Sequence, residues 1–254
     1  MPVYGRFEWE GSPRFGEIIE NRVYFLDDLF GSRQRTGEST TRDGLRVLAP
    51  VTPSKIVAIG LNYVDHAAES GQEVPQEPLM WLKAPTSIIA HNETIELAYP
   101  EHRTDYEAEL TVVIGKTCRV ASEADALDYV LGYTNGQDIS DRKIQRGESQ
   151  WARAKSMDTY SPMGPFIHAD LDPTGLIVES FLNGERKQSN NTSQLVFSVA
   201  KLIEFISRDI TLLPGDCIMT GTPFGVGPLS AGDVLETRIT GVTPLVNTVA
   251  NRVR

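Results

Sequence analysis

The chain has 254 residues, of which 40% are hydrophobic and 23% charged, a composition typical of a globular protein with one domain, or one domain and a small appendage. The formal net charge of −10 argues against a nucleic-acid-binding surface, which needs clustered Lys and Arg. The two cysteines, Cys118 and Cys217, lie far apart and fit no disulfide framework, so we expect reduced thiols. The N-terminus lacks the apolar core of a signal peptide, and no apolar run approaches the roughly 20 residues of a membrane helix, so we expect a cytoplasmic protein without a membrane partner.

The first part of the chain predicts a small β-rich unit. Residues 14–19 and 21–26 are runs of strand type broken by turn residues. The polar stretch 31–44, rich in Ser, Thr, Arg and Gly, indicates an exposed loop or linker. We therefore expect a small N-terminal unit over residues 1–48 and a larger domain over residues 49–254.

The larger part mixes short strands with short helices and is mostly β, so the predicted fold class is α+β. Hydrophobic periodicity and turn residues set the boundaries of its elements. In chain order we expect a buried strand at 55–60, a helix at 62–69, a strand at 79–84 stopped by Pro85, a strand at 105–115, a helix at 123–129 capped by Ser122, a strand from 129 towards 135, a loop-rich region at 136–165, a strand at 176–182 with a hairpin turn at Asn183 and Gly184, a helix at 193–207, and short strands around Ile218, Val234 and Val246.

Two glutamates in the predicted strand 105–115 share one face. Side chains alternate along a strand, so Glu107 and Glu109 point the same way and the apolar residues between them point to a core. Two adjacent carboxylates repel each other, and a shared proton, a basic side chain or a cation must neutralise them. Oxygen ligands suit Mg²⁺, Mn²⁺ or Ca²⁺. The alternative is a solvated strand face or a salt-bridged pair.

A third carboxylate could come from the segment 135–142. It follows a β-type run and opens a loop, so Asp138 is placed to supply an oxygen. Asp141 competes for that role, and spacing alone does not choose between them.

The predicted helix 62–69 places His66 and Glu69 three residues apart, on one face. A carboxylate beside an imidazole orients the ring and stabilises its protonated form. Such a pair suits a general base that acts on water. The alternative is a surface ion pair.

Other polar residues are further candidates for the site. Lys155 lies in the loop-rich region and could bind a carboxylate or stabilise a developing enolate, unless it is only solvated. Lys83 ends a predicted strand and could reach a substrate, and Thr222 lies in a Thr-Gly-Thr-Pro turn that could hold a carboxylate. Arg142 and Gln145 follow in the same loop as Asp138.

Six segments, taken together, resemble the fumarylacetoacetate hydrolase family and span roughly residues 55 to 250. Each is weak alone, but all six in the family's order are highly specific. They are residues 60–69, 81–85, 105–115, 132–142, 150–159 and 220–223.

The resemblance implies a mixed, β-rich roll of the family's C-terminal-domain type, and a homodimer. It implies Mg²⁺ or Mn²⁺, with Ca²⁺ also possible, on Glu107, Glu109 and Asp138, and so prefers Asp138 to Asp141.

The resemblance also implies roles for the remaining site residues. Lys155 would lie in the active site. His66 and Glu69 would form an acid/base dyad on a lid that orders when substrate binds. Thr222 would contact the substrate or lie beside it.

The family acts on 2-oxo acids or their enols, as C–C bond hydrolases, decarboxylases or keto–enol isomerases. A metal chelated by the 2-oxo and carboxylate oxygens stabilises an enolate. Residues 82–85, 106–110 and 122–126 resemble the 2-hydroxyhepta-2,4-diene-1,7-dioate isomerase / 5-carboxymethyl-2-oxo-hex-3-ene-1,7-dioate decarboxylase branch of aromatic catabolism. We therefore expect a small anionic 2-oxo acid substrate.

The sequence is also compatible with other functions. The His66–Glu69 pair keeps the hydrolysis of acylpyruvates or of fumarylacetoacetate-type substrates, and the decarboxylation of oxaloacetate, as alternatives. A catalytically inactive binding module of the same fold, and a metal-free hydrolase that uses Glu107 and Glu109 as an acid/base pair, are the others.

Overall fold

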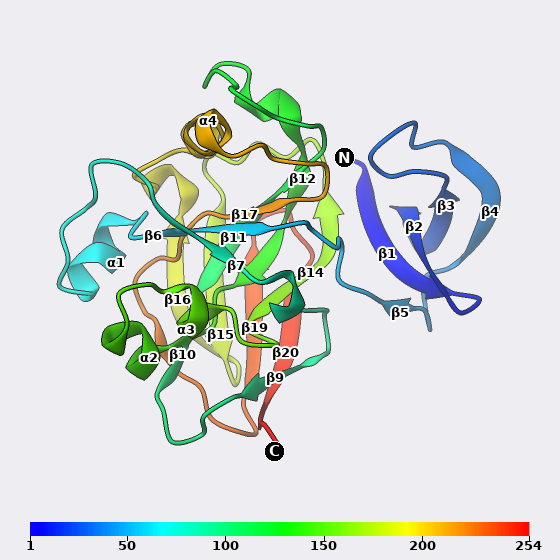
Figure 1. Cartoon of the computed structure of the whole chain (residues 1–254). Helices are drawn as coiled ribbons and strands as arrows, with labels where there is room; N and C mark the ends of the chain where they lie inside the picture. Colours follow the sequence, from blue (N-terminus) through cyan, green and yellow to red (C-terminus); the bar gives the residue numbers. More distant parts are fainter. Residues whose placement is uncertain (254) are drawn as a thin grey trace.

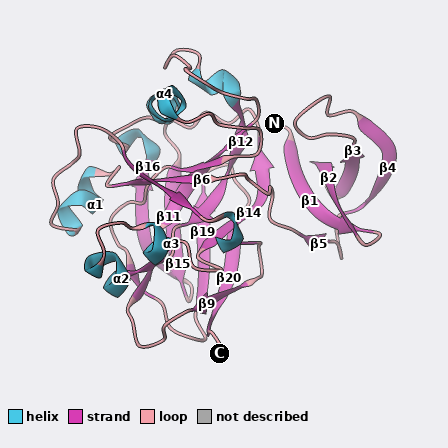
Figure 2. Ribbon diagram, viewed as in Figure 1, coloured by secondary structure: helices cyan, strands magenta, loops and turns pink. Residues whose placement is uncertain are grey.

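The computed structural model describes residues 1–253 and is built mainly of strands, with short helices at the periphery (Figure 1, Figure 2). The β-rich character expected from the sequence is confirmed. No helix within residues 1–253 is long and apolar enough to cross a membrane.

The largest sheet runs in the order β4-β3-β2-β1-β14-β12-β11-β17-β6-β7, with β5 paired to β1 and β8 to β14. Its central strand β11 is buried along its whole length between β12 and β17. The bounds are β1 Val3–Trp9, β2 Ser12–Ile19, β3 Arg22–Leu26, β4 Arg35–Thr41, β5 Arg46–Val47, β6 Ile56–Gly60, β7 Leu79–Lys83, β8 Ile88–Ile89, β11 Ala108–Ile114, β12 Val130–Gln137, β14 Ser161–His168 and β17 Cys217–Met219.

Two smaller sheets flank it, in the orders β13-β10-β18 and β16-β15-β19-β20-β9. The hairpin between β15 and β16 turns at Asn183 and Gly184, whose φ angles of 52° and 82° suit a tight hairpin turn, as predicted. The bounds are β9 Thr94–Leu97, β10 Thr104–Tyr106, β13 Ser140–Asp141, β15 Ile177–Leu182, β16 Glu185–Asn191, β18 Gly227–Pro228, β19 Val234–Ile239 and β20 Leu245–Asn251.

The helices are short, and α4 is the one that packs most extensively on the core. Its apolar residues Leu202, Ile203 and Ile206 are fully buried, and Ser198 caps its first turn by accepting a hydrogen bond from the Lys201 backbone N–H at 3.1 Å. The bounds are α1 Val64–Glu69, α2 Arg142–Gly147, α3 Ala152–Lys155 and α4 Val199–Asp209, and the 3₁₀ turns are η1 Pro85–Ser87, η2 Ala126–Tyr129 and η3 Thr192–Gln194.

The core lies on both faces of β11. Ala108, Leu110 and Val112 pack in one cluster with α4, whereas Val113 packs on the opposite face beside Met219. This alternation is the strand periodicity that the sequence indicated.

Several predicted elements were wrong in kind or extent. The polar stretch 31–44 contains strand β4, because polar side chains on an exposed edge strand still pair with β3; Arg35 bonds to Glu17 at 2.7 Å and lies over the Tyr24 ring. The expected helix at 123–129 is only the 3₁₀ turn η2, since Ser122 bonds to Asp125 within a turn.

Two further segments differ from the prediction. The region 136–165, predicted to be rich in loops, holds α2, α3 and the start of β14. Strand β14 is fully buried, but its glycine and proline residues favoured a loop in the prediction. The predicted helix 193–207 begins only at Val199, because Asn191 and Ser198 cap separate helical segments.

Strands β1 to β5 lie to one side of the remaining structure (Figure 1). Strand β1 joins the large sheet by pairing with β14, opposite His168 and Ile167. The division of the chain at residue 48 stays a prediction.

The parallel pair β6 and β17 starts at a buried carboxylate, Asp216. Its Oδ1 accepts hydrogen bonds from the Ser54 backbone N–H and hydroxyl at 3.0 and 2.7 Å and from the Lys55 N–H at 3.1 Å. Its Oδ2 accepts from the Leu213 N–H at 2.7 Å and pairs with the Lys55 ammonium. These contacts hold the ends of two strands that carry the site.

We expect Asp216→Asn to lower the free energy of unfolding by about 3 kcal/mol, because an amide has one acceptor oxygen where the site supplies donors to two. Urea denaturation measures the change. Asp209→Asn is the matched control, since that side chain is 63% exposed, and it should change stability by less than about 0.5 kcal/mol. Equal effects of the two variants would contradict the role of Asp216.

Candidate metal centre and its cavity

Glu107 lies at a break between two strands. The single strand expected over 105–115 is divided into β10 and β11, which belong to different sheets. The backbone N–H groups at the break are satisfied by side chains: Gln137 accepts from Glu107 at 2.9 Å and Gln188 accepts from Ala108 at 3.0 Å. Glu109 follows inside β11.

Asp138 comes directly after β12, the neighbour of β11. Its N–H donates to the Glu107 carbonyl at 2.9 Å, which holds the two residues side by side. Gly136 lies opposite Glu109 in the ladder, and a Cβ there would collide with the Thr111 hydroxyl. Glycine therefore lets β11 and β12 approach closely just before Asp138.

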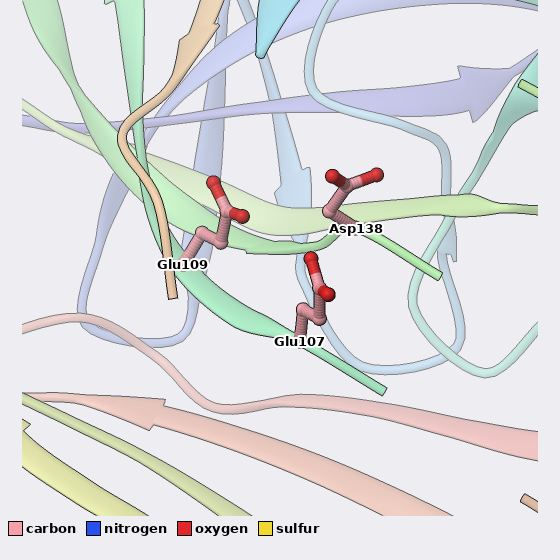
Figure 3. Close-up of side chains that lie close together, drawn as sticks. All are labelled: Glu107, Glu109 and Asp138. Carbon is pink, nitrogen blue, oxygen red and sulfur yellow. The ribbon is translucent and has the colours of Figure 1, made fainter. Parts of the chain in front are cut away.

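The carboxylates of Glu107, Glu109 and Asp138 face a common space (Figure 3). Each offers an oxygen within 4.8 Å of the others, and all three side chains are buried. Asp141, the competing aspartate, is held elsewhere: it bonds to His102 Nδ1 at 2.7 Å and caps α2 by accepting from the Ile144 N–H at 3.0 Å. The structure thus brings Asp138, and not Asp141, to the two glutamates.

Cations surround two of the three carboxylates. The Lys155 ammonium lies 2.7 Å from both Glu107 Oε2 and Asp138 Oδ2, Arg142 lies 2.6 Å from Glu107 Oε1, and Lys83 pairs with Asp138. Burial by itself raises the pKa of Glu107, but the charges of Lys155 and Arg142 outweigh it and hold that pKa well below its usual range. Glu107 is therefore ionised.

Glu109 lacks such a partner. It accepts a hydrogen bond from the Gly221 N–H at 2.7 Å, and no Lys, Arg or His within residues 1–253 forms an ion pair with it. Burial, followed by the charges of Asp138 and Glu107, raises its pKa well above the usual value. A positive ion among these oxygens would remove that penalty, and an all-oxygen donor set suits Mg²⁺, Mn²⁺ or Ca²⁺. The residues therefore fit a divalent cation.

The turn between Thr220 and Thr222 directs the Gly221 N–H at Glu109. Each threonine hydroxyl donates to a β11 carbonyl at 2.9 Å, Thr220 to Leu110 and Thr222 to Ala108. Gln188 also donates to the Thr222 hydroxyl, at 2.8 Å. With its only proton donated to Ala108, the Thr222 hydroxyl fixes the turn, and the contact of Thr222 with the substrate, or its place beside it, stays a prediction.

Helix α1 carries the predicted dyad. His66 Nδ1 lies 3.0 Å from Glu69 Oε2, and Glu69 Oε1 accepts from the Gly225 N–H at 3.1 Å. Asn62, just before the helix, is buried and donates to the Phe197 and Thr220 carbonyls at 3.1 and 2.8 Å. The start of α1 is thereby tied to the turn beside Glu109.

A cavity of about 380 Å³ opens beside the carboxylates. Most of the predicted site residues meet on it although they come from distant parts of the chain. The predicted residues that line it are His66, Glu69, Glu107, Glu109, Arg142, Gln145, Lys155 and Thr222.

Lys83 does not contact this cavity in the described part of the chain. Its ammonium pairs with Asp138, which is also absent from the cavity lining, and donates to the Tyr160 carbonyl at 2.9 Å. This position suits a side chain that holds Asp138, and the substrate contact of Lys83 stays a prediction.

Lys155 lines the cavity with its three ammonium protons already engaged. They point to Glu107, Asp138 and the Ser140 hydroxyl, each at 2.7 Å, and the ammonium lies 5.0 Å from the centre of the Trp81 ring. It can serve a substrate only if one of these acceptors turns away.

Sequence reasoning missed part of the cavity wall. Trp81 and Trp151 meet edge to face at 5.2 Å, and Gly60 ends β6 where a Cβ would come within 2.8 Å of Trp151. Both tryptophans stand within motifs used for the family resemblance, which was the available signal. Arg103 and Arg146 also line the cavity, and no pattern singled them out.

The chain is similar to several known proteins. The chain matches the family model for the fumarylacetoacetate (FAA) hydrolase C-terminal region over residues 55–250. It is 46% identical over 195 residues to the 2,4-didehydro-3-deoxy-L-rhamnonate hydrolase of Sphingomonas sp. The matched region covers 72% of this chain and 68% of the relative. It is 39% identical over 249 residues to the oxaloacetate tautomerase of Xenopus laevis, which covers 93% and 78%.

The fold agrees with a solved relative along its whole length. The 2-hydroxyhepta-2,4-diene-1,7-dioate isomerase from Mycobacterium marinum superposes with a TM-score of 0.92 at 36% identity, covering 100% of both chains. The match of the family model to most of the chain and the agreement in fold lead to one conclusion: the chain belongs to the fumarylacetoacetate hydrolase family.

Proposed function

We propose that this protein is a Mg²⁺- or Mn²⁺-dependent enzyme that acts on a 2-oxo acid or its enol, with an activity like that of 2-hydroxyhepta-2,4-diene-1,7-dioate isomerase/decarboxylase. The full-length similarity to an isomerase of that name supports this choice within the family. On the family resemblance we also propose a homodimer.

The observation that carries the proposal is that Glu109 is buried beside two other carboxylates without a cationic partner within residues 1–253. A carboxylate that is buried against two others, with a raised pKa and no cationic partner within residues 1–253, is costly to keep ionised unless a positive ion joins it. A purely structural cluster would place a basic side chain there, as it does at Glu107 and Asp138.

Glu107, Glu109 and Asp138 would hold the cation at the inner end of the cavity. When bound, it supplies the positive charge that stabilises an enolate of the 2-oxo acid. Arg142 keeps Glu107 ionised and in place through its 2.6 Å contact, and its Nη1 fixes Gln145 at 2.8 Å. Gln145 thereby presents its amide group to the cavity in one orientation.

The proton chemistry falls to the dyad. Glu69 orients the His66 ring through Nδ1, which leaves Nε2 to take or deliver a proton. Isomerisation needs only such a shuttle between two carbon atoms or a carbon and an oxygen. Trp81 and Trp151 supply an apolar wall that limits water at the reacting atoms.

A second candidate is C–C bond hydrolysis of an acylpyruvate or fumarylacetoacetate-type substrate. The same dyad favours it, because a histidine oriented by a carboxylate can activate a water molecule. The similarity to a rhamnonate hydrolase supports this candidate, and that to an oxaloacetate tautomerase supports keto–enol chemistry, with oxaloacetate decarboxylation as a further alternative.

Removal of divalent metal should abolish activity. We expect EDTA treatment followed by desalting to reduce turnover to background, because the positive charge that would stabilise the enolate is then missing, and we expect added Mg²⁺ or Mn²⁺ to restore turnover. Turnover of a panel of 2-oxo acids before and after metal addition measures this. Full activity in rigorously metal-free protein would support the metal-free acid/base hydrolase instead.

Glu109→Gln should weaken Mg²⁺ binding by about 100-fold or more, since even the loss of an outer partner of a metal ligand costs 10- to 100-fold. Calorimetry gives the affinity, and the rise in melting temperature with Mg²⁺ gives an independent readout. The control is Glu101→Gln, because that side chain is 66% exposed and outside the cluster. An affinity in Glu109→Gln equal to that of the control would reject Glu109 as a ligand.

His66→Asn should test the role of the dyad, and the wild-type activity on a panel of substrates should separate the candidate reactions. We expect it to lower kcat by about 100- to 10,000-fold for every substrate whose slow step is a proton transfer, as is typical of a general acid or base. The panel contains oxaloacetate, acylpyruvates and 2-hydroxy-dienedioates, each with Mg²⁺. Wild-type turnover that is highest on acylpyruvates would favour the hydrolase, and an unchanged kcat in His66→Asn on all substrates would exclude the dyad from catalysis.

A further inference from the structure

Helix α2 presents a row of polar side chains to the cavity. Arg142, Gln145 and Arg146 stand three and four positions apart, so they share one face of the helix, and all three line the cavity. Arg142 is buried at the inner end against Glu107, and Gln145 accepts its hydrogen bond. Arg146 is exposed. The row therefore leads from the carboxylates to the solvent side of the cavity.

Arg146 differs from the other basic residues of the cavity in its lack of an acidic partner. Arg103 is the nearest alternative, but its Nε and Nη2 bind Asp105 at 2.7 and 3.1 Å. Within residues 1–253 no acidic side chain pairs with Arg146. The other pairs are His66 with Glu69, Lys155 with Glu107 and Asp138, and Arg142 with Asp105 and Glu107.

We propose that Arg146 binds a second carboxylate at the far end of the substrate, so that the enzyme selects 2-oxo acids with an acid group at both ends. This rests on the proposed function, which assigns the first carboxylate and the 2-oxo group to the inner end. A guanidinium binds a carboxylate through two parallel hydrogen bonds, and an unpaired one at a cavity is free to do so.

The geometry of the helix sets the scale of the substrate. Four residues of helix separate Arg142 from Arg146 by a rise of about 6 Å along the axis. A carbon chain of several atoms between the two acid groups spans such a distance. Because Arg146 is exposed, it stays hydrated when a monocarboxylate binds, and selection comes from attraction of the second carboxylate.

The test is a pair of ligands that differ only at the far end, 2-oxoadipate and 2-oxohexanoate. We expect the Mg²⁺-loaded wild type to bind 2-oxoadipate about tenfold more tightly in calorimetry, as for one added charge-assisted contact. Arg146→Gln should abolish this preference because it weakens the binding of 2-oxoadipate alone. The affinities for 2-oxohexanoate and for oxalate should stay within about twofold of the wild-type values. Arg146→Lys should keep part of the preference, since it retains the charge without the planar fork.

The matched control is Arg153→Gln. Arg153 is an exposed arginine on α3 that pairs with Glu148 and does not line the cavity, so its variant should keep the wild-type preference. A preference retained in Arg146→Gln, or equal Mg²⁺-dependent binding of both ligands by the wild type, would overturn the role of Arg146 alone. Failure of the Mg²⁺-loaded wild type to bind either ligand would overturn the proposed function together with it.

Discussion

The mutual repulsion of three buried carboxylates is the constraint on which the rest of the site depends. Glu107, Glu109 and Asp138 bring their oxygens within 4.8 Å of one another in the interior. Unpaired charges in such a place cost several kcal/mol each, so the surrounding structure must supply positive charge. The positive charge is distributed unevenly. Lys155, Arg142 and Lys83 form ion pairs with Glu107 and Asp138, whereas Glu109 has no cationic partner within residues 1–253.

Several hydrogen bonds around the cluster keep these carboxylates together. The break between β10 and β11 frees backbone donors that Gln137 and Gln188 satisfy, and the turn at Gly221 brings one N–H to Glu109. Asn62 then connects that turn to the helix with the dyad. A change at any of these contacts would alter the cluster and the dyad together, because they share the same backbone segments.

The sequence predicted what depends on local pattern and failed where distant segments decide. Alternation along a strand was enough to pair Glu107 with Glu109, although it could not reveal that the strand breaks at Glu107. The family motifs favoured Asp138 over Asp141 as the third carboxylate. The physical reason lies in tertiary contacts, because Asp141 instead bonds to His102 and caps the start of α2.

The same limit explains what else the sequence did not predict. Lys83 ends a strand as expected, but only the tertiary structure shows that its ammonium pairs with Asp138 and donates to the Tyr160 carbonyl. Strand β4 was not predicted because its side chains are polar. An edge strand depends on backbone pairing, here with β3, more than on apolar side chains. Neither fact has a local signature in the sequence.

The cavity therefore has two ends with different physical properties. At the inner end Glu107 and Asp138 contact Lys155 or Arg142, so a substitution in these pairs leaves a buried partner without compensation and costs several kcal/mol. At the outer end Arg146 is exposed and unpaired within the described chain, and exposed positions change stability by only about 0.5 kcal/mol when substituted. Chemistry that depends on the carboxylates is thus tightly constrained, whereas the choice of substrate tail can vary at little cost to the fold. If Arg146 binds the substrate tail as proposed, a substitution there changes the preference for a second carboxylate without disturbing the buried carboxylate cluster.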